Sequence, residues 1–164
     1  MKRAIYPGTF DPFTKGHEDI LKRALKVFDE ITVLVAVSPS KKALFSQKER
    51  VEMIEETFLK DSRVKVDSWD GLVVEYAKSK GIQALVRGLR PTGDFEMEFQ
   101  MASMNGHLYS EIDTFWLPTG GKHYFVSSTL VKELYTHGRD IGEFIPQTVL
   151  GYLKKKKNEY IFLF

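Results

Sequence analysis

Hydrophobic positions along the chain follow two alternating periods, one typical of strands and the other of helices. Short runs rich in β-branched and aromatic residues predict five strands, at residues 3–6, 31–37, 63–66, 83–88 and 112–117. Between these runs, apolar residues recur every three or four positions, as they do on one face of a helix. The first such segment starts near Thr14 or Gly16 and carries Ile20, Leu21, Ala24, Leu25 and Phe28.

Capping signals mark the starts of further helices. Ser46 followed by Glu49 forms a capping-box pattern at the head of the second helix. Ser127 or Ser128 is the expected N-cap of a later helix at residues 129–135. The remaining predicted helices cover residues 71–79, residues 95–109 and the segment that follows Pro146.

The order of these elements predicts the fold class. Strand and helix alternate over five repeats, which is typical of an open parallel sheet with helices on both faces. Apolar residues make up 43% of the chain and charged residues 28%, enough for a sizeable core. No repeat or linker divides the sequence. We therefore expect a single doubly wound α/β domain over residues 1–164, with a five-stranded parallel sheet.

Composition narrows the possible partners and compartment. The formal net charge of +2 is too small to indicate binding to nucleic acid or to a membrane surface. The lysine run at residues 154–157 is expected at the end of the last helix, where the helix dipole and solvent favour lysine; an anion-binding tail is the alternative. An RNA-binding module would rest on this run alone, without an aromatic platform. Cysteine is absent and no apolar run is long enough for a signal peptide or membrane span, so we expect a cytoplasmic protein.

Candidate chemistry gathers where the predicted strands end. In open α/β sheets, ligands bind beyond the carboxyl ends of the strands, where helix N-termini converge. Hydroxyls, glycines and cations stand at these places: Gly8, Thr9 and residues 14–17, then Lys41 and Lys42, then Arg87 and Arg90, then residues 118–129. Gly8 would allow a tight turn, and Gly16 would let the backbone approach a ligand closely. This concentration of donors predicts a site for a strongly anionic ligand such as a polyphosphate.

Each candidate also has a plainer interpretation. His17 would reach an anion bound at the first helical turn, although an isolated histidine near a helix start often has no such role. Arg87 offers a planar fork that matches two phosphate oxygens, and its alternative is an ion pair with Asp94 or Glu96. The hydroxyls at residues 127–129 serve equally well as helix caps or as anion ligands.

Several common chemistries are disfavoured by missing motifs. The sequence lacks the P-loop and the G-x-G-x-x-G fingerprint, so the commonest ATPase and dinucleotide-binding classes are removed. It also lacks a G-x-S-x-G nucleophile elbow. The four histidines, at positions 17, 107, 123 and 137, have no spacing suited to zinc, and we expect no metal site built from protein ligands.

Four segments resemble a known enzyme family. They are YPGTFDPFTKGH (residues 6–17), SPSKK (38–42), LVRGLRPTGDFEMEFQMASMN (85–105) and FVSSTLVKE (125–133). The T-x-G-H turn alone marks only the nucleotidylyltransferase superfamily, and the middle segment at residues 85–105 is the more specific part. Together the four segments resemble the bacterial phosphopantetheine adenylyltransferases, and the resemblance runs from Arg3 to about Leu153. The resemblance implies a Rossmann-like fold and adenylyl transfer from ATP to 4'-phosphopantetheine, giving dephospho-coenzyme A and pyrophosphate. It also implies Mg²⁺ held mainly by the ATP phosphates, and a homohexamer.

The resemblance also implies residue roles. Thr9 orients the incoming phosphate, His17 stabilises the transition state at the α-phosphate, and Lys41 and Arg87 hold the pantetheine phosphate. The pantetheine arm is expected against Val73, Met104 and Asn105. Nucleotide contacts are expected from Thr9, Phe10, His17, Gly88, Leu89, Arg90, Glu98, His123, Tyr124, Phe125, Val126, Ser127, Ser128 and Thr129.

The chain departs from the family pattern in a few places. Pro91 and Gly93 differ from the residues usual after RGLR, His123 stands where an aromatic such as Trp is common, and Thr129 replaces a serine. The apolar tail YIFLF lies outside the resemblance. Two alternatives remain: a sister nucleotidylyltransferase with another phosphate or alcohol acceptor, and a nucleotide sensor without catalysis.

Overall fold

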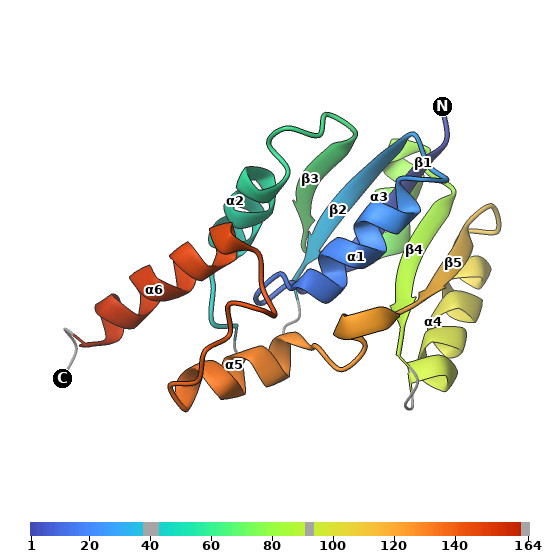
Figure 1. The fold of residues 1–164 in the computed structure, drawn as a ribbon. Coiled ribbons are helices and arrows are strands. Elements are labelled where there is room, and N and C mark those ends of the chain that lie inside the picture. Colours follow the sequence, from blue (N-terminus) through green and yellow to red (C-terminus); the bar gives the residue numbers. More distant parts are fainter. Residues whose placement is uncertain (38–42, 91–93, 162–164) are drawn as a thin grey trace.

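The fold is built on one five-stranded sheet. A computed structural model describes residues 1–37, 43–90 and 94–161. All neighbouring strands pair in parallel, in the order β3-β2-β1-β4-β5 (Figure 1). The strands are β1 (Arg3–Gly8), β2 (Glu30–Ala36), β3 (Val64–Trp69), β4 (Ala84–Leu89) and β5 (Asp113–Pro118). The order reverses beside β1, and this switch point is where doubly wound folds bind ligands.

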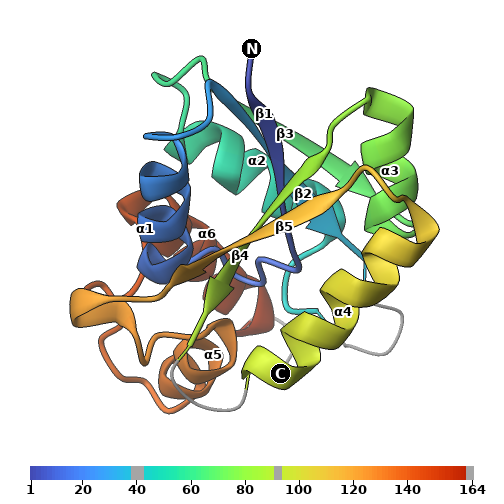
Figure 2. The same ribbon diagram turned by 90° about the vertical axis from the view of Figure 1, so that its right-hand side faces the viewer.

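Helices cover both faces of the sheet (Figure 2). One face carries α1 (Lys15–Ala24), α2 (Gln47–Thr57) and α6 (Gln147–Ile161), and the other carries α3 (Val73–Lys80) and α4 (Asp94–Leu108). A short 3₁₀ turn η1 (Gly121–His123) leads to α5 (Ser128–Thr136), which crosses beyond the carboxyl ends of the strands in Figures 1 and 2. The doubly wound α/β class expected from the sequence is therefore confirmed.

The two faces have separate cores because strand side chains alternate in direction. Tyr6 of β1 packs with the cluster that includes residues of α1, α2, α5 and α6. Ile5, its neighbour, packs with Leu34, Leu85 and the buried residues of α3. The central strands β1, β2 and β4 are thus buried on both faces, which explains their apolar runs.

The predicted elements are present with small shifts at their ends. Each strand overlaps its predicted range, and β1 continues two residues further, to Gly8. Ser46 and Glu49 form the expected capping box of α2, with Glu49 N 3.2 Å from Ser46 Oγ. The structure also decides two helix starts that the sequence left open. Thr14 is the N-cap of α1, and Ser127 rather than Ser128 is the N-cap of α5. Within the described ranges, no helix combines the length and the apolar character needed to cross a membrane.

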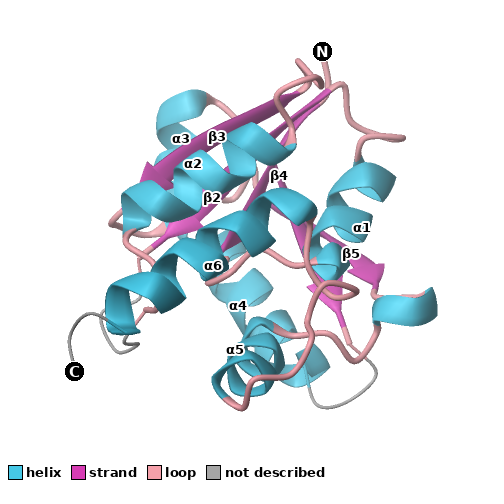
Figure 3. Ribbon diagram, turned by 60° about the vertical axis from the view of Figure 1, so that its left-hand side comes forward, coloured by secondary structure: helices cyan, strands magenta, loops and turns pink. Residues whose placement is uncertain are grey.

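The lysine run does not lie at the end of the last helix, contrary to the sequence-based expectation. Helix α6 continues to Ile161, so residues 154–157 lie inside it. Lys156 forms an ion pair with Glu49 of α2, with Nζ 2.8 Å from Oε1, and its Nζ also lies over the Phe45 ring. These contacts hold α6 beside α2 (Figure 3). Lys156 therefore serves packing between helices.

Candidate active site

A cleft of about 390 Å³ opens at the carboxyl ends of β1 and β4, beside the N-termini of α1 and α5. We call it the large cleft. It is lined by the β1–α1 turn, the end of β4, Glu98 of α4 and the start of α5. Most residues expected to contact a nucleotide line it: Thr9, Phe10, His17, Gly88, Arg90, Glu98, Val126, Ser127, Ser128 and Thr129. Arg87, expected at the pantetheine phosphate, lines it as well. Chain segments far apart in the sequence thus meet at one edge of the sheet.

The β1–α1 turn is shaped by the buried ring of Phe10. This residue has a φ of 50°, in the left-handed region, which costs roughly 1–2 kcal/mol for a residue with a Cβ. Its ring packs edge-on against Tyr6 and His17, with centroids 5.3 and 5.0 Å away. A Cβ on Gly8 would lie 2.7 Å from this ring, so glycine is required there for space. The phenylalanine side chain is therefore part of the core, and the turn presents its backbone to the cleft.

His17 is fixed by the cap of α1. The Thr14 amide donates to His17 Nδ1 at 3.0 Å, and the His17 amide donates to Thr14 Oγ1 at 3.3 Å. Because Nδ1 accepts a hydrogen bond, the proton of the neutral imidazole is assigned to Nε2. The ring thus offers one N–H donor on the edge opposite to the cap, and His17 lines the large cleft.

The surroundings of His17 keep the imidazole neutral. Tyr6, Phe10 and Phe13 all have rings within 6.5 Å of the His17 ring centroid. This burial, together with the nearby charges of Arg90 and Arg87, lowers the pKa of His17 to about 3. At neutral pH His17 is therefore a hydrogen-bond donor without charge.

Two amides in the first turn of α1 are already bonded within the protein. Lys15 N donates to Phe144 O at 2.8 Å, and His17 N is used by the cap. Gly16 N has no acceptor among the described residues. A Cβ on Gly16 would lie 3.5 Å or more from its nearest neighbours, which is an ordinary contact distance, so packing does not require glycine at this position.

Three residues that sequence reasoning missed hold the turn in place. Asp11 is buried and accepts hydrogen bonds from the amides of Leu44 and Phe45, both at 2.9 Å. Lys132 of α5 donates to Asp11 Oδ2 at 2.8 Å. Arg50 of α2 is also buried and donates from Nη1 to the Thr9 carbonyl at 2.7 Å. The polar residues Asp11 in GTFD and Lys132 in LVKE could have been noticed in the sequence. Their partners, however, lie far away along the chain.

Arg87 is already engaged from two sides. Its guanidinium donates to both carboxylate oxygens of Glu98, with Nε 2.9 Å from Oε2, and Nη1 donates to the Pro7 carbonyl at 2.7 Å. The ion-pair alternative from the sequence named Asp94 or Glu96; the partner is Glu98, one turn further along α4. Among the described cations of the large cleft, Arg90 forms no ion pair.

The hydroxyls at the start of α5 have separate tasks. Ser127 Oγ accepts from the Leu130 amide at 3.1 Å and caps the helix. Ser128 Oγ donates to the Pro12 carbonyl at 2.8 Å, which ties α5 to the β1–α1 turn. Thr129 lines the cleft beside them. The N-terminus of α5 therefore faces the same space as that of α1, and both helix dipoles favour an anion there.

A second cleft of about 300 Å³ adjoins the first, and we call it the side cleft. It shares the wall formed by Pro7, Gly8, Thr9, Arg87 and Glu98 with the large cleft. Its other lining includes Val73 at the start of α3 and Asn105 of α4, as expected for the pantetheine arm, but Met101 and Ala102 in place of Met104. The side cleft also contains Leu72, Leu85 and Val37, so it suits a longer, less polar ligand.

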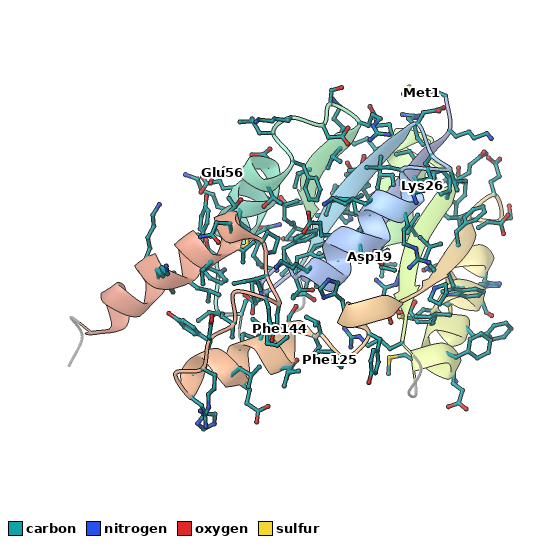
Figure 4. All side chains as sticks on the ribbon, in the orientation of Figure 1. Met1, Asp19, Lys26, Glu56, Phe125 and Phe144 are labelled. Carbon is teal, nitrogen blue, oxygen red and sulfur yellow. The ribbon has the colours of Figure 1, made fainter. Side chains whose placement is uncertain are left out.

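Other expected contacts are not brought to either cleft. Tyr124 and Phe125 are exposed, and Phe125 packs against Phe144 from the segment after α5 (Figure 4). His123 lines a separate hollow with Asp19 and Arg23 of α1, and its buried Nδ1 has no partner among the described residues. Leu89, another expected nucleotide contact, does not line either cleft, and its carbonyl accepts a hydrogen bond from the Thr119 hydroxyl. Lys41, Lys42, Pro91 and Gly93 lie outside the described residues.

The fold and the cleft define a class of protein. A parallel sheet with a hydroxyl-, amide- and arginine-lined cleft at its switch point is the arrangement of nucleotide-binding α/β enzymes. Residues 5–134 match the cytidylyltransferase-like family, so the class is that of the nucleotidylyltransferases.

Curated relatives narrow the class further. The chain is 45% identical over 161 residues to the phosphopantetheine adenylyltransferase of Heliobacterium modesticaldum, covering 98% of this chain and 96% of that protein. It is 46% identical to the enzyme of the same name from Thermotoga neapolitana, over 95% and 97% of the two chains. The match to the one from Alkaliphilus metalliredigens is 44%, over 95% and 99%. The chain belongs to the phosphopantetheine adenylyltransferase family.

Proposed function

We propose that this protein transfers the adenylyl group of ATP to 4'-phosphopantetheine, giving dephospho-coenzyme A and pyrophosphate in coenzyme A biosynthesis. The observation that carries the proposal is the pair of adjoining clefts with a common wall at Thr9 and Arg87. One cleft is rich in donors for a nucleotide, and the other suits a longer arm. Two substrates bound in them meet at the shared wall.

The reaction proceeds by direct in-line displacement. A phosphate oxygen of 4'-phosphopantetheine attacks the α-phosphorus of ATP, and the bond from that phosphorus to the bridging oxygen of pyrophosphate breaks. The nucleophile is already ionised at neutral pH, so no general base is needed. Catalysis then consists of positioning two anions that repel each other and of stabilising charge at the transferring group.

The residues of the large cleft divide this work. The neutral Nε2–H of His17 donates to an α-phosphate oxygen, where charge redistributes in the transition state. Thr9 orients the incoming phosphate, and Arg87, held by Glu98, neutralises it together with Lys41. Arg90, Gly88 and the start of α5 bind the nucleotide phosphates. The assignment of Lys41 rests on the family resemblance, and that of the others also on their positions around the cleft.

Mg²⁺ is proposed to accompany ATP, held mainly by phosphate oxygens, which are the hard ligands this ion prefers. The two carboxylates lining the large cleft are committed elsewhere, Asp11 to amides and Lys132, and Glu98 to Arg87. No group of three or more His, Cys, Asp or Glu side chains suited to a metal ion is present among the described residues. The ion would partly neutralise the phosphates that the cleft binds.

We further propose that the whole chain, residues 1–164, acts as one domain and assembles into a homohexamer. Support for self-association comes from α4, where Met97, Met101, Met104 and Leu108 form one exposed stripe at spacings of four, three and four residues. Such a stripe is typical of a surface covered by another chain. A cytoplasmic location remains a prediction from the sequence.

The decisive experiment mixes the protein with ATP, Mg²⁺ and 4'-phosphopantetheine and detects dephospho-coenzyme A by mass spectrometry. Parallel reactions with nicotinate mononucleotide or glycerol 3-phosphate as acceptor test for a sister transferase. We expect turnover with 4'-phosphopantetheine as the acceptor and none with nicotinate mononucleotide or glycerol 3-phosphate. Turnover with another acceptor only would contradict the substrate, and ATP binding without pyrophosphate release would indicate a sensor.

A further inference from the structure

Tyr6 of β1 carries a hydroxyl that the mechanism above does not use. The residue is 4% exposed, and its ring packs edge-on against Phe10 and His17. Its hydroxyl makes no hydrogen bond with any described residue. The other buried tyrosine among these residues, Tyr76, differs in this respect, because its hydroxyl donates to Asp67 Oδ2 at 2.8 Å.

The Tyr6 hydroxyl opens into the large cleft. A hydroxyl that leaves water without a partner costs free energy, so native proteins rarely bury one in this way. Among the described residues, the partnerless side-chain atoms sealed from solvent are Trp116 Nε1 and His123 Nδ1. The Tyr6 hydroxyl is not one of them, and Tyr6 lines the cleft. A ligand in the cleft can therefore supply the partner that the protein does not.

The position of Tyr6 indicates which substrate would meet this hydroxyl. Tyr6 lines the large cleft but not the side cleft, whereas Thr9 and Arg87 line both. Its side chain lies on the face of the sheet that α1 covers, in the same core cluster as Ile20 of that helix. A ligand that reaches Tyr6 is therefore the nucleotide and not the acceptor.

The neighbours of Tyr6 favour the ribose over the other parts of the nucleotide. The ring centroid of His17, which is assigned to the α-phosphate, lies 6.5 Å from that of Tyr6. The ribose is joined directly to the α-phosphate, so it is the next group along the nucleotide. Tyr6 comes two residues before the end of β1 and so lies deeper than the turn, where uncharged Ile20 and Gly88 also line the cleft. A Cβ on Gly88 would lie 3.2 Å from Ile20 Cγ1, so glycine keeps this part of the cleft open.

We propose that the Tyr6 hydroxyl forms a hydrogen bond with a ribose hydroxyl of the nucleotide. The inference rests on the proposed function and adds a binding residue to it. Burial raises the pKa of Tyr6 above its ordinary value, against the opposing charges of Arg87 and Arg90, so the phenol stays protonated at neutral pH. A protonated phenol donates and accepts, as a ribose hydroxyl does. The contact exists before and during the displacement, so it contributes to ATP binding and not to kcat.

Two competing explanations are separable from this one. The hydroxyl could face water only, in which case its removal would change neither ATP affinity nor turnover. It could instead be a second donor to the α-phosphate beside His17. Its removal would then lower kcat, and it would affect nucleotides with and without each ribose hydroxyl alike.

The first experiment measures ATP affinity by calorimetry for wild type, Tyr6→Phe and the control Tyr76→Phe. Tyr6→Phe removes one oxygen and keeps the ring that packs against His17. Loss of one hydrogen bond predicts that this variant binds ATP about three- to ten-fold more weakly. Tyr76→Phe removes an equally buried hydroxyl that lines neither cleft, so it should match wild type. Unchanged ATP affinity in Tyr6→Phe would overturn the proposal.

Deoxynucleotides test whether the ribose is the partner. Wild type should bind at least one of 2'-deoxy-ATP and 3'-deoxy-ATP about three- to ten-fold more weakly than ATP. Tyr6→Phe should weaken binding of that analogue less than about two-fold, because the contact is already missing. Equal losses for ATP and both analogues would assign Tyr6 to a phosphate or the base and refute the proposal. Equal affinity of wild type for all three nucleotides would refute it without any variant.

Urea unfolding tests whether the hydroxyl serves the fold instead. Tyr6→Phe should keep or raise the unfolding midpoint, because its hydroxyl has no partner to lose in the free protein. Tyr76→Phe should lower the midpoint, since it loses the bond to Asp67. A lowered midpoint in Tyr6→Phe would contradict the premise that this hydroxyl is unpartnered.

Steady-state kinetics separates binding from chemistry. Tyr6→Phe should raise KM for ATP while kcat changes less than about two-fold. A fall in kcat with KM unchanged would make Tyr6 a donor to the transferring phosphate and refute the ribose contact. Calorimetry needs no turnover, so failure of the proposed reaction would not be confused with failure of this inference. Absence of ATP binding in wild type would contradict both.

Discussion

Replacing His17 by Ala tests the central chemical assignment. The Thr14 amide fixes Nδ1 as an acceptor, so the variant loses one donor, the Nε2–H. Because the pKa of His17 is about 3, this donor is uncharged at neutral pH. Removing one preorganised donor from a transition state typically costs about 3–4 kcal/mol, a factor of roughly 10² to 10³ in rate. We therefore expect kcat to fall by about 10² or more.

The assay separates transition-state stabilisation from binding. Pyrophosphate release gives kcat and KM at saturating levels of both substrates, and calorimetry gives the Kd for ATP. Since Arg90 and the start of α5 remain, the Kd for ATP should change only a few-fold. His17→Gln is the matched variant because its amide N–H extends to a similar distance, and it should recover part of the lost rate.

Two results would refute this reasoning. Unchanged turnover in His17→Ala would remove the donor role altogether. A loss confined to KM for ATP would show that His17 binds the ground state as strongly as the transition state. Denaturant unfolding of each variant must accompany the kinetics, because His17→Ala deprives the Thr14 amide of its acceptor, whereas the side-chain oxygen of Gln at this position can replace it.

Three further predictions follow from the same geometry. Free His17 has a pKa of about 6.5 and the folded residue about 3, so below pH 6.5 the unfolded chain gains a proton that the folded chain does not. Wild type should thus lose about 2 kcal/mol of stability in total between pH 7 and 5 relative to His17→Gln, measured by urea unfolding; parallel curves would contradict the lowered pKa. Gly8→Ala should destabilise by about 1–3 kcal/mol through its clash with Phe10, and wild-type stability would show that the ring moves freely. Met97→Glu should reduce the sedimentation mass if α4 forms an interface, and an unchanged mass would exclude this stripe.

The fold was predictable because its signals are local. The central strands β1, β2 and β4 carry buried apolar runs, and Ser46 with Glu49 marks the start of α2 within four residues of sequence. Because the strands are parallel, their carboxyl ends lie at the same edge of the sheet. The sequence could therefore place Thr9, His17 and Arg87 near one another without any structure.

The supports of the site were not predictable in this way. Asp11 lies 33 residues before Leu44 and 121 before Lys132, so no local pattern connects these residues. An aspartate in a turn before proline also looks like an ordinary turn residue. Arg50 shows the same difficulty, since its contact with the Thr9 carbonyl depends on the packing of α2 against the first turn.

The sequence could not identify the partner of Arg87, because this depends on which face of α4 is turned toward β4. Asp94, Glu96 and Glu98 all fall near the start of α4, and their spacing does not tell which one faces β4. In the fold, Glu98 points to the wall shared by both clefts and holds the guanidinium from one side, with Pro7 on the other. The guanidinium is thus fixed in place by the protein itself, with its Nε–Nη2 edge bonded to the Glu98 carboxylate.

The lowered pKa of His17 agrees with the chemistry of the proposed reaction. A general acid or base should have a pKa near the working pH, and a pKa of about 3 leaves His17 poorly suited to that task. A reaction between an ionised phosphate and ATP needs no proton removed from its nucleophile. What it needs is a donor at a fixed place, and the aromatic rings of Tyr6, Phe10 and Phe13 hold the imidazole rigidly while keeping it neutral. The same packing that completes the core around the first turn therefore sets the protonation state on which the proposed role of His17 depends.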